Sequence, residues 1–178
     1  MPDPADLTDG APTTSVDRVA AIQQEWHRER PELDVSPLGV IGRIHRLASA
    51  LTPQLTEVYA RHGLSEGDFD VLAALRRAGS PFERAPGTLA RSTMVTTGGM
   101  TKRLDRLVAA GLITRRASTE DGRRRVVALT TEGKSLIDRA FDDHLENERR
   151  LLSMLEPQDV VQLEQLLGRW LSRVEGTS

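Results

Sequence analysis

The sequence predicts a mainly α-helical protein that contains one small β-hairpin. Apolar residues recur at helical spacing through most of the 178 residues, and aromatic residues make up only 3%, so the core must consist mainly of Leu, Val, Ile and Ala. The helical spacing of the apolar residues is interrupted once. There, two short strand-like runs, 112–116 and 125–130, flank an Asp-Gly pair typical of a hairpin turn. Two helices separated by a tight turn precede this hairpin. Their order is that of a winged helix-turn-helix.

The N-terminal third of the chain predicts a tail and two helices. Residues 1–13 are rich in Pro, Asp, Thr and Gly, and we expect them to be disordered. Thr14 and Asp17 resemble a capping box at the start of a short helix. A long helix follows, and Pro53 should kink or split it. We assign 14–63 to N-terminal helices on the dimerisation and ligand side.

The next helix has the strongest start signal in the chain. Ser65 is an expected N-cap, Asp68 follows three residues later, and Leu64 with Phe69 forms an expected hydrophobic staple. The segment 80–87 predicts a connection between two helices, since it contains two prolines and a glycine.

The helix-turn-helix occupies the residues after that connection. A short helix is expected over 88–94, and Thr96 or Thr97 can cap the recognition helix, which Gly111 should stop. We assign 64–130 to a winged helix-turn-helix DNA-binding domain. The expected buried positions of the recognition helix are Met100, Leu104, Leu107 and Val108.

The C-terminal part predicts two further helices. Thr130 or Thr131 caps the first, and Pro157 begins the second at a position where the missing N–H has no cost. Both helices carry apolar stripes and extend beyond what a winged helix needs, so we expect the two ends of the chain to build a dimer interface. We assign 131–178 to C-terminal dimerisation helices. Their stripes contain Ile137, Phe141, His144 or Leu145, Glu148, Leu152, Leu155, Val160, Leu163, Leu166, Leu167, Trp170, Leu171 and Val174.

The charge is unevenly distributed along the chain. From 102 to 125 eight residues are basic and three are acidic, a net +5, which leaves −7 for the rest of a chain whose formal total is −2. An acidic body with one basic face indicates a protein that binds a polyanion. A solvated charged hairpin is one alternative, and a winged helix that binds only proteins is another. Loss of binding at raised salt would favour DNA, because phosphate contacts release counterions.

The start of the recognition helix and the hairpin supply the candidate DNA contacts. Gly98 and Gly99 allow a backbone approach to phosphate at the positive helix end, although tight packing against the preceding helix would also explain Gly99. Arg123 can enter a narrow A·T-rich minor groove. Asp121 should hold an arginine across the turn and structure the wing, unless it is an exposed turn residue. The predicted DNA-binding residues are Thr96, Thr97, Gly98, Thr101, Lys102, Arg106, Arg123, Arg124 and Arg125.

Several classes of function lack a matching motif. The chain has no cysteine, and its four histidines form no metalloprotease motif, so we predict no enzyme, no cofactor and no metal site. A metal-responsive regulator of the same fold is the alternative to this interpretation. No apolar run approaches about 18 residues, and the N-terminus has no signal-peptide pattern. We therefore expect a cytoplasmic protein that does not engage a membrane.

Residues 36–174 resemble the MarR family of winged-helix transcription regulators. The resemblance rests on the order of the G-L-I-x-R strand, the wing pair Asp121 and Arg123, and the L-T-x-x-G exit that ends at Gly133. It implies a homodimer that binds double-stranded DNA at a pseudo-palindromic operator, usually as a repressor that a small ligand releases. The additional N-terminal helix and Pro53 depart from the family pattern.

The additional helix resembles that of a MarR-like subgroup that responds to urate and related anions. In that subgroup the ligand lies between the N-terminal helix and the winged-helix lobe. The resemblance implies urate or another aromatic or anionic effector here, whose binding would break a pairing of Asp70 with Arg103 and move the recognition helix. An interface role for the tryptophan and a plain salt bridge for that pair are the alternatives. The implied ligand residues are Trp26, Arg30, Arg43, Asp70 and Arg103.

Overall fold

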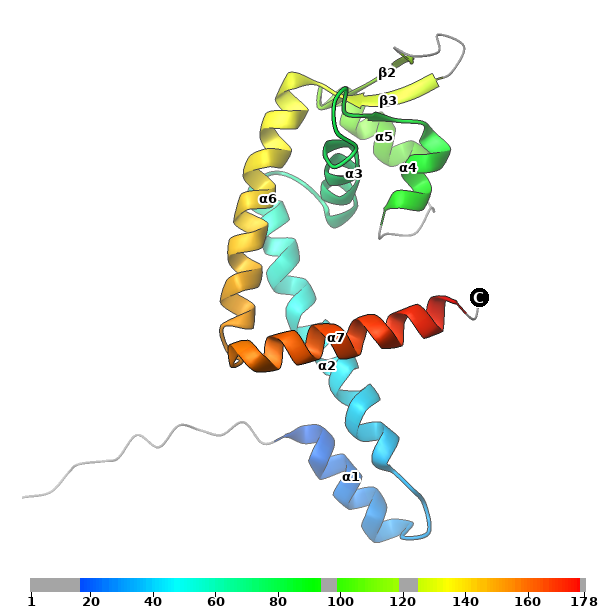
Figure 1. The fold of residues 1–178 in the computed structure, drawn as a ribbon, viewed down its shortest axis with the longest axis vertical. Helices are drawn as coiled ribbons and strands as arrows, with labels where there is room; N and C mark the ends of the chain where they lie inside the picture. The colour runs from blue at the N-terminus through cyan, green and yellow to red at the C-terminus, as the bar shows by residue number, and fades with distance from the viewer. Residues whose placement is uncertain (1–16, 94–98, 119–124, 177–178) are drawn as a thin grey trace, which may run out of the picture. The chain divides into compact units, whose positions relative to one another are not determined.

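The computed structural model describes residues 17–93, 99–118 and 125–176, and within these no helix is long and apolar enough to cross a membrane. The chain divides into two compact units, Met1–Leu51 and Thr52–Ser178 (Figure 1). The elements are α1 (Arg18–Glu29), α2 (Ser36–Arg61), α3 (Glu66–Arg76), β1 (Glu83–Arg84), α4 (Pro86–Ser92), α5 (Met100–Ala109), β2 (Ile113–Ala117), β3 (Arg125–Leu129), α6 (Thr131–Leu152) and α7 (Pro157–Glu175).

The first unit contains α1 and the N-terminal half of α2. Asp17 is the N-cap of α1, and its Oδ1 accepts the N–H groups of Val19 and Ala20 at 3.0 and 3.3 Å. The expected capping box beginning at Thr14 is therefore wrong, because the helix starts at Arg18. Val19 packs so closely against Gly42 that a Cβ there would lie 3.1 Å from Val19 Cγ1.

Helix α2 passes through Pro53 as one continuous element, so the expectation that it splits there is wrong. The proline removes one backbone donor from the helix. The hydroxyl of Thr56 bonds to two nearby carbonyls, those of Thr52 at 3.1 Å and Pro53 at 3.0 Å. These side-chain bonds supplement the backbone ladder beyond the proline, and α2 continues to Arg61.

The second unit contains the winged helix. Its sheet is antiparallel with the order β1-β3-β2, and β2 pairs with β3 from Ile113↔Leu129 to Ala117↔Arg125 (Figure 1). Strand β1 adds two residues at the other edge of β3, with Glu83 opposite Ala128. The connection predicted over 80–87 thus contains a strand that was not predicted, because β3 offers its free edge to a segment too short to signal a strand by itself.

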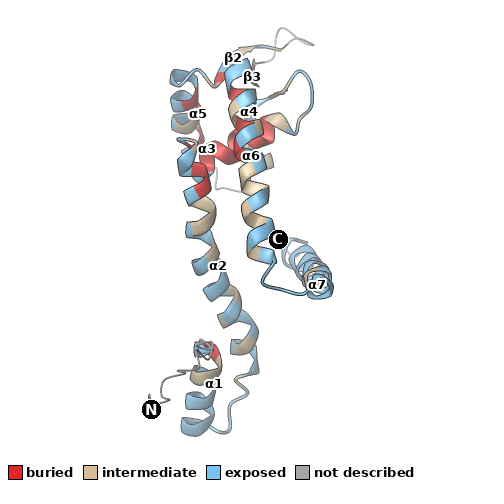
Figure 2. Cartoon of the chain, turned by 90° about the vertical axis from the view of Figure 1, so that its left-hand side faces the viewer, coloured by how far each residue is buried: buried red, intermediate tan, exposed pale blue. Residues whose placement is uncertain are grey.

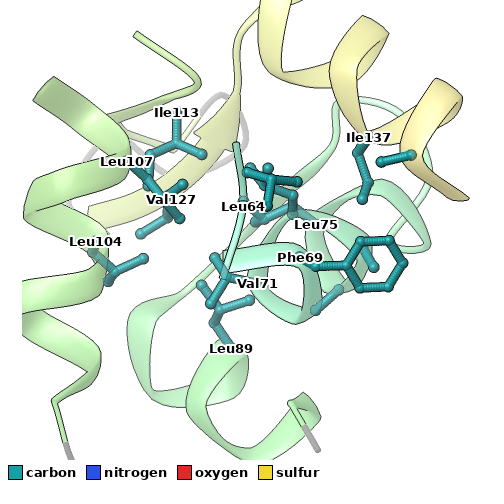
Figure 3. Packing of buried hydrophobic residues seen from close by; sticks show 14 of the residues in the cluster. Leu64, Phe69, Val71, Leu75, Leu89, Leu104, Leu107, Ile113, Val127 and Ile137 are labelled. Carbon is teal, nitrogen blue, oxygen red and sulfur yellow. The ribbon is translucent and has the colours of Figure 1, made fainter. Parts of the chain in front are cut away.

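The core of this lobe surrounds α3. Figure 2 shows the buried residues concentrated on this helix and its neighbours, and Figure 3 shows apolar side chains of α4, α5, α6 and β3 meeting there. Aliphatic packing dominates this core, as the composition predicted. The largest fully buried side chains are Leu72, Leu75, Leu89, Leu107, Ile113, Ile137, Val71 and Val127.

Local end signals account for most helix boundaries. Ser65 and Asp68 form the expected capping box of α3, Thr130 caps α6, and Gly111 follows α5 in a left-handed conformation with φ +72°. The expected cap at Thr96 or Thr97 is wrong, because α5 begins later with Gly99 as its N-cap. Val108 is also more exposed than expected, since it turns away from the buried face of α5.

Helix α7 begins at Pro157 as predicted, but no residue of this helix is buried in the single chain. Figure 2 shows the helix as exposed over its length. In the preceding helix Phe141 is likewise 42% exposed, although Ile137 is fully buried. The apolar stripes of the C-terminal helices are therefore only partly covered by their own chain.

Candidate nucleic-acid interface

The exposed side of α5 carries the described part of the predicted recognition surface. Thr101 and Lys102 are exposed, whereas Met100, Leu104 and Leu107 face the core. This division follows from the helical period, which separates residues 101 and 102 from the buried stripe. Thr96, Thr97 and Gly98 were also predicted to contact DNA and lie outside the described residues.

Gly99 gives this helix an open start. Its φ of +83° is a left-handed conformation that glycine adopts without strain, and a Cβ there would have nothing within 4 Å. The alternative explanation of Gly99 by tight packing is therefore wrong. Gly99 has no side chain to cap the helix, and among the described residues no side-chain cap of the first N–H groups of α5 is found.

The hairpin of β2 and β3 forms the base of the wing. Arg125 is exposed at the start of β3, directly opposite Ala117. The predicted wing residues Asp121, Arg123 and Arg124 lie outside the described part of the chain. Arg125 is thus the only predicted wing arginine among the residues that the structure describes.

Arg106, which was predicted to contact the DNA backbone, pairs with Asp68 of α3. Its Nη2 lies 2.6 Å from Asp68 Oδ1 and 3.4 Å from Ser65 Oγ. Burial alone would raise the pKa of Asp68, but hydrogen bonds from Arg106 and Ser65 outweigh this effect and hold the pKa below its ordinary value. The pair joins the recognition helix to the first turn of α3.

Two more arginines of the basic segment pair with carboxylates. Arg115 Nη1 lies 2.7 Å from Asp105 Oδ1, and Arg116 Nη2 lies 2.5 Å from Glu83 Oε2. The sequence indicates these arginines, and Asp105, only as charge, and neither the pairing with Asp105 nor the role of Glu83 was predicted. Only the strongly basic character of the segment hinted that acidic partners would be needed.

The residues implied for the ligand site divide between the two units. Trp26, Arg30 and Arg43 belong to the first unit, and Asp70 and Arg103 belong to the second. Trp26 is 46% exposed. Two carboxylates of the first unit engage the arginines: Glu32 pairs with Arg30, and Asp17 with Arg43. The hydrogen bond from Arg43 holds the pKa of Asp17 below its ordinary value.

Arg103 lies against α3 in an unusual environment. Its Nε and Nη1 are buried and make no hydrogen bond in the described part of the lobe. The guanidinium occupies the space over Gly67, where a Cβ would lie 2.3 Å from Arg103 Cζ. Asp70 is also buried, but the ion pairs found between described residues do not include the expected pairing with Arg103.

A cavity of about 600 Å³ lies between α3 and α6, apart from the residues implied for ligand binding. Ala73, Ile137 and Phe141 supply apolar walls, and Arg76 with Asp138 forms a 2.6 Å ion pair at its edge. The hydrogen bond from Lys134, supported by Arg76, lowers the pKa of Asp138. Elsewhere, no group of three or more His, Asp or Glu residues suited to a metal ion occurs among the described residues.

Comparison with known proteins decides how this lobe is classified. The MarR family sequence model matches residues 62–124, which hold the helix-turn-helix and strand β2 and end just before β3. The HTH-type transcriptional regulator PecS of Dickeya dadantii (strain 3937) is 41% identical over 152 residues, 85% of this chain and 91% of PecS. The chain belongs to the MarR family.

Two further similarities are to a transcriptional repressor and to a protein solved in complex with DNA. The HTH-type transcriptional repressor YetL of Bacillus subtilis (strain 168) is 27% identical over 142 residues, 80% of this chain and 84% of YetL. The crystal structure of MarR C80S from E. coli complexed with operator DNA is 25% identical, with a TM-score of 0.62, over 82% of this chain and 97% of that chain. The protein is thus a DNA-binding, repressor-like transcriptional regulator of the MarR type, and these relatives are regulators rather than enzymes.

Proposed function

We propose that the protein is a homodimer that represses transcription from a pseudo-palindromic operator and leaves it when a small aromatic or anionic ligand binds. The observation that carries the DNA part is the exposed polar face of α5, which lies beside a basic hairpin. Thr101 and Lys102 present one hydroxyl and one cation on that face. An α-helix fits the major groove, and such side chains reach base edges or phosphates there.

The glycine start of α5 supports a phosphate contact at the same helix. The uncapped N–H groups lie at the positive end of the helix dipole, and Gly99 leaves open space for a close approach. Arg123, Arg124 and Arg125 would contact the neighbouring groove and backbone from the wing. Thr96, Thr97 and Gly98 would complete the contacts at the helix start, while Asp121 would structure the wing.

The exposed apolar residues of α7 support the homodimer. Each buried leucine contributes about 1.5–3 kcal/mol, so a stripe of them at the surface favours association. We expect Leu166→Glu to dissociate the dimer in sedimentation velocity, and the polar-face change Gln165→Glu to leave it intact. The exposed apolar residues of this helix are Val161, Leu163, Leu166, Leu167, Trp170, Leu171 and Val174.

The buried guanidinium atoms of Arg103 support an anionic group in the ligand. A charged group without hydrogen-bond partners is costly away from water, and an anion would satisfy it. Arg103 is also part of the recognition helix, so a ligand held there would act directly on the DNA-reading element. Trp26, Arg30, Arg43 and Asp70 remain the other proposed ligand residues, and urate is the first compound to try.

Fluorescence anisotropy with DNA from immediately upstream of the protein's own gene tests this function. The control is random DNA of equal length, and both are titrated at two salt concentrations. We expect binding that weakens with salt and is at least about 10³-fold tighter to the upstream DNA. Equally weak binding to both, followed by failure to select a preferred site from random sequences, would contradict a sequence-specific regulator.

A further inference from the structure

Strand β2 carries two consecutive arginines whose side chains leave opposite faces of the sheet. On one side Arg115 reaches α5, where its Nη1 lies 2.7 Å from Asp105 Oδ1 and its Nη2 lies 3.4 Å from Thr101 O. On the other side Arg116 reaches β1, where its Nη2 lies 2.5 Å from Glu83 Oε2. The same short strand is therefore joined to the recognition helix and to the far edge of the sheet.

The contact with β1 spans the central strand. Glu83 lies opposite Ala128 of β3, while Arg116 lies opposite Val126, two residues along the same face. The Glu83 side chain is only 9% exposed, and its Oε1 also accepts the hydroxyl of Ser118 at 3.2 Å. A carboxylate so far removed from water needs a cation, and Arg116 of β2 supplies it.

The contact of Arg115 with α5 is more exposed. Its main effect is on the orientation of β2 relative to α5, and its effect on stability is small. An exposed ion pair contributes little to stability, in the range of about 0–1 kcal/mol. Asp105 follows Thr101 by four residues and thus shares its side of α5. Arg115 bonds to both of these residues, so it fixes the direction of β2 relative to the face of α5 that meets DNA.

We propose that Arg115 and Arg116 are not phosphate contacts but hold the base of the wing in a fixed orientation to the recognition helix. Asp105 and Glu83 are then positioning residues for DNA binding. Wing and recognition helix engage different grooves, and both can engage together only when their relative orientation matches the DNA. This role goes beyond the family assignment, which names no residue for it.

The direction in which DNA affinity changes, when Asp105 or Glu83 loses its charge, distinguishes a positioning role from a simple electrostatic effect. Removing a carboxylate from a face that meets a polyanion should tighten DNA binding if charge alone mattered. If the carboxylates position the wing, Asp105→Asn and Glu83→Gln should both weaken binding of the full-length protein. We expect up to about fivefold for Asp105→Asn, whose ion pair is exposed, and about tenfold for Glu83→Gln, whose carboxylate is buried. Glu132→Gln removes the same charge from an exposed residue at the start of α6, and it should leave affinity unchanged or slightly improved.

Anisotropy on the preferred DNA, with melting curves to confirm folding, provides the readout. Weaker binding by folded Asp105→Asn and Glu83→Gln supports the proposal, and equal or tighter binding by both overturns it. The exchanged pair Asp105→Arg with Arg115→Asp should recover part of the affinity that either single change loses. If Glu83→Gln does not fold, Arg116→Gln takes its place in the comparison.

The salt dependence of binding tests the arginines themselves. Loss of a phosphate contact lowers the slope of log K against log salt by about one, whereas loss of a positioning contact leaves the slope unchanged. Arg115→Gln and Arg116→Gln should therefore lower affinity at constant slope, in contrast to Lys102→Gln, which should flatten it. A flattened slope for either arginine variant would show that this arginine binds phosphate, and the proposal would then be wrong for it.

Discussion

Arg106 of the recognition helix donates a 2.6 Å hydrogen bond to Asp68, whose side chain is only 7% exposed in the first turn of α3. The other carboxylate oxygen of Asp68 accepts the backbone N–H of Ser65 at 3.2 Å and closes the capping box. One carboxylate thus both starts α3 and holds α5 against it. The ionised carboxylate therefore contributes to the contact between α5 and α3.

We expect Asp68→Asn to lower the free energy of unfolding by about 1–2 kcal/mol at neutral pH, since charge-assisted hydrogen bonds are lost. The folded-state pKa of Asp68 is below its unfolded value, so its contribution is present above about pH 4 and disappears as the pH falls through the lowered pKa. In urea denaturation at several pH values, the free energy of unfolding should fall less on acidification for the variant than for the unmodified protein. An equally reduced pH dependence of the free energy of unfolding for the exposed control Asp142→Asn would contradict the assignment.

Gly133→Ala should destabilise the lobe by about 2–4 kcal/mol. A Cβ at this position would lie 1.9 Å from the carbonyl oxygen of Leu112, which also accepts the N–H of Thr130 at 3.1 Å. Backbone must therefore move where α6 meets the end of the recognition helix. Thermal melting provides the measurement, with Gly87→Ala as the control because its Cβ would contact only a flexible arginine end. Equal melting temperatures for the two variants would contradict the close approach of Gly133 to the carbonyl oxygen of Leu112.

Tyr59 is the single tyrosine of the chain, so its ionisation can be followed directly by ultraviolet absorption. Burial, reinforced by nearby carboxylates, raises its pKa to about 12. In denaturant we expect a midpoint near the ordinary value of about 10. The unfolded state ionises first as the pH rises, so stability should fall above about pH 10. A native midpoint near 10 would contradict the buried position of the ring.

Arg123→Ala should weaken DNA binding by about 1–3 kcal/mol and reduce the preference for A·T pairs beside the half-sites. The reason is that an arginine in a narrow minor groove meets enhanced negative potential. Anisotropy titrations on DNA with A·T or G·C flanks measure both effects. Arg139→Ala, an exposed change on α6, is the charge-matched control. Unchanged affinity in a folded dimer would contradict the wing assignment.

Trp26→Ala should leave DNA binding intact and weaken the response to ligand, because Trp26 belongs to the proposed ligand residues and lies outside the winged-helix lobe. The measurement is the ligand concentration that releases half of the bound DNA, with urate as the first compound. Trp170→Ala changes the other tryptophan and should instead weaken dimerisation. Loss of DNA binding and dimerisation by Trp26→Ala would indicate an interface anchor.

Local signals predicted the winged helix well because its boundaries depend on neighbouring residues. The capping box of Ser65, the left-handed Gly111 and the first-turn Pro157 act within one helical turn, and the structure has each where the sequence placed it. The start of α5 was predicted too early, since the helix begins after a left-handed Gly99 that has no side-chain cap. Threonine is a favoured N-cap residue, and this preference placed the predicted start at Thr96 or Thr97.

The sequence by itself determined the helix order, the hairpin strands, most of the winged-helix core and the family, because each depends on periodicity or on motifs of adjacent residues. Only the tertiary structure decided that Glu83 belongs to a strand, that it meets Arg116, and that Asp68 meets Arg106. These partners are separated by more than 30 residues, and a two-residue strand exists only because β3 offers it hydrogen bonds. Chain folding, rather than local propensity, brings such charges together, and so no local pattern could reveal them.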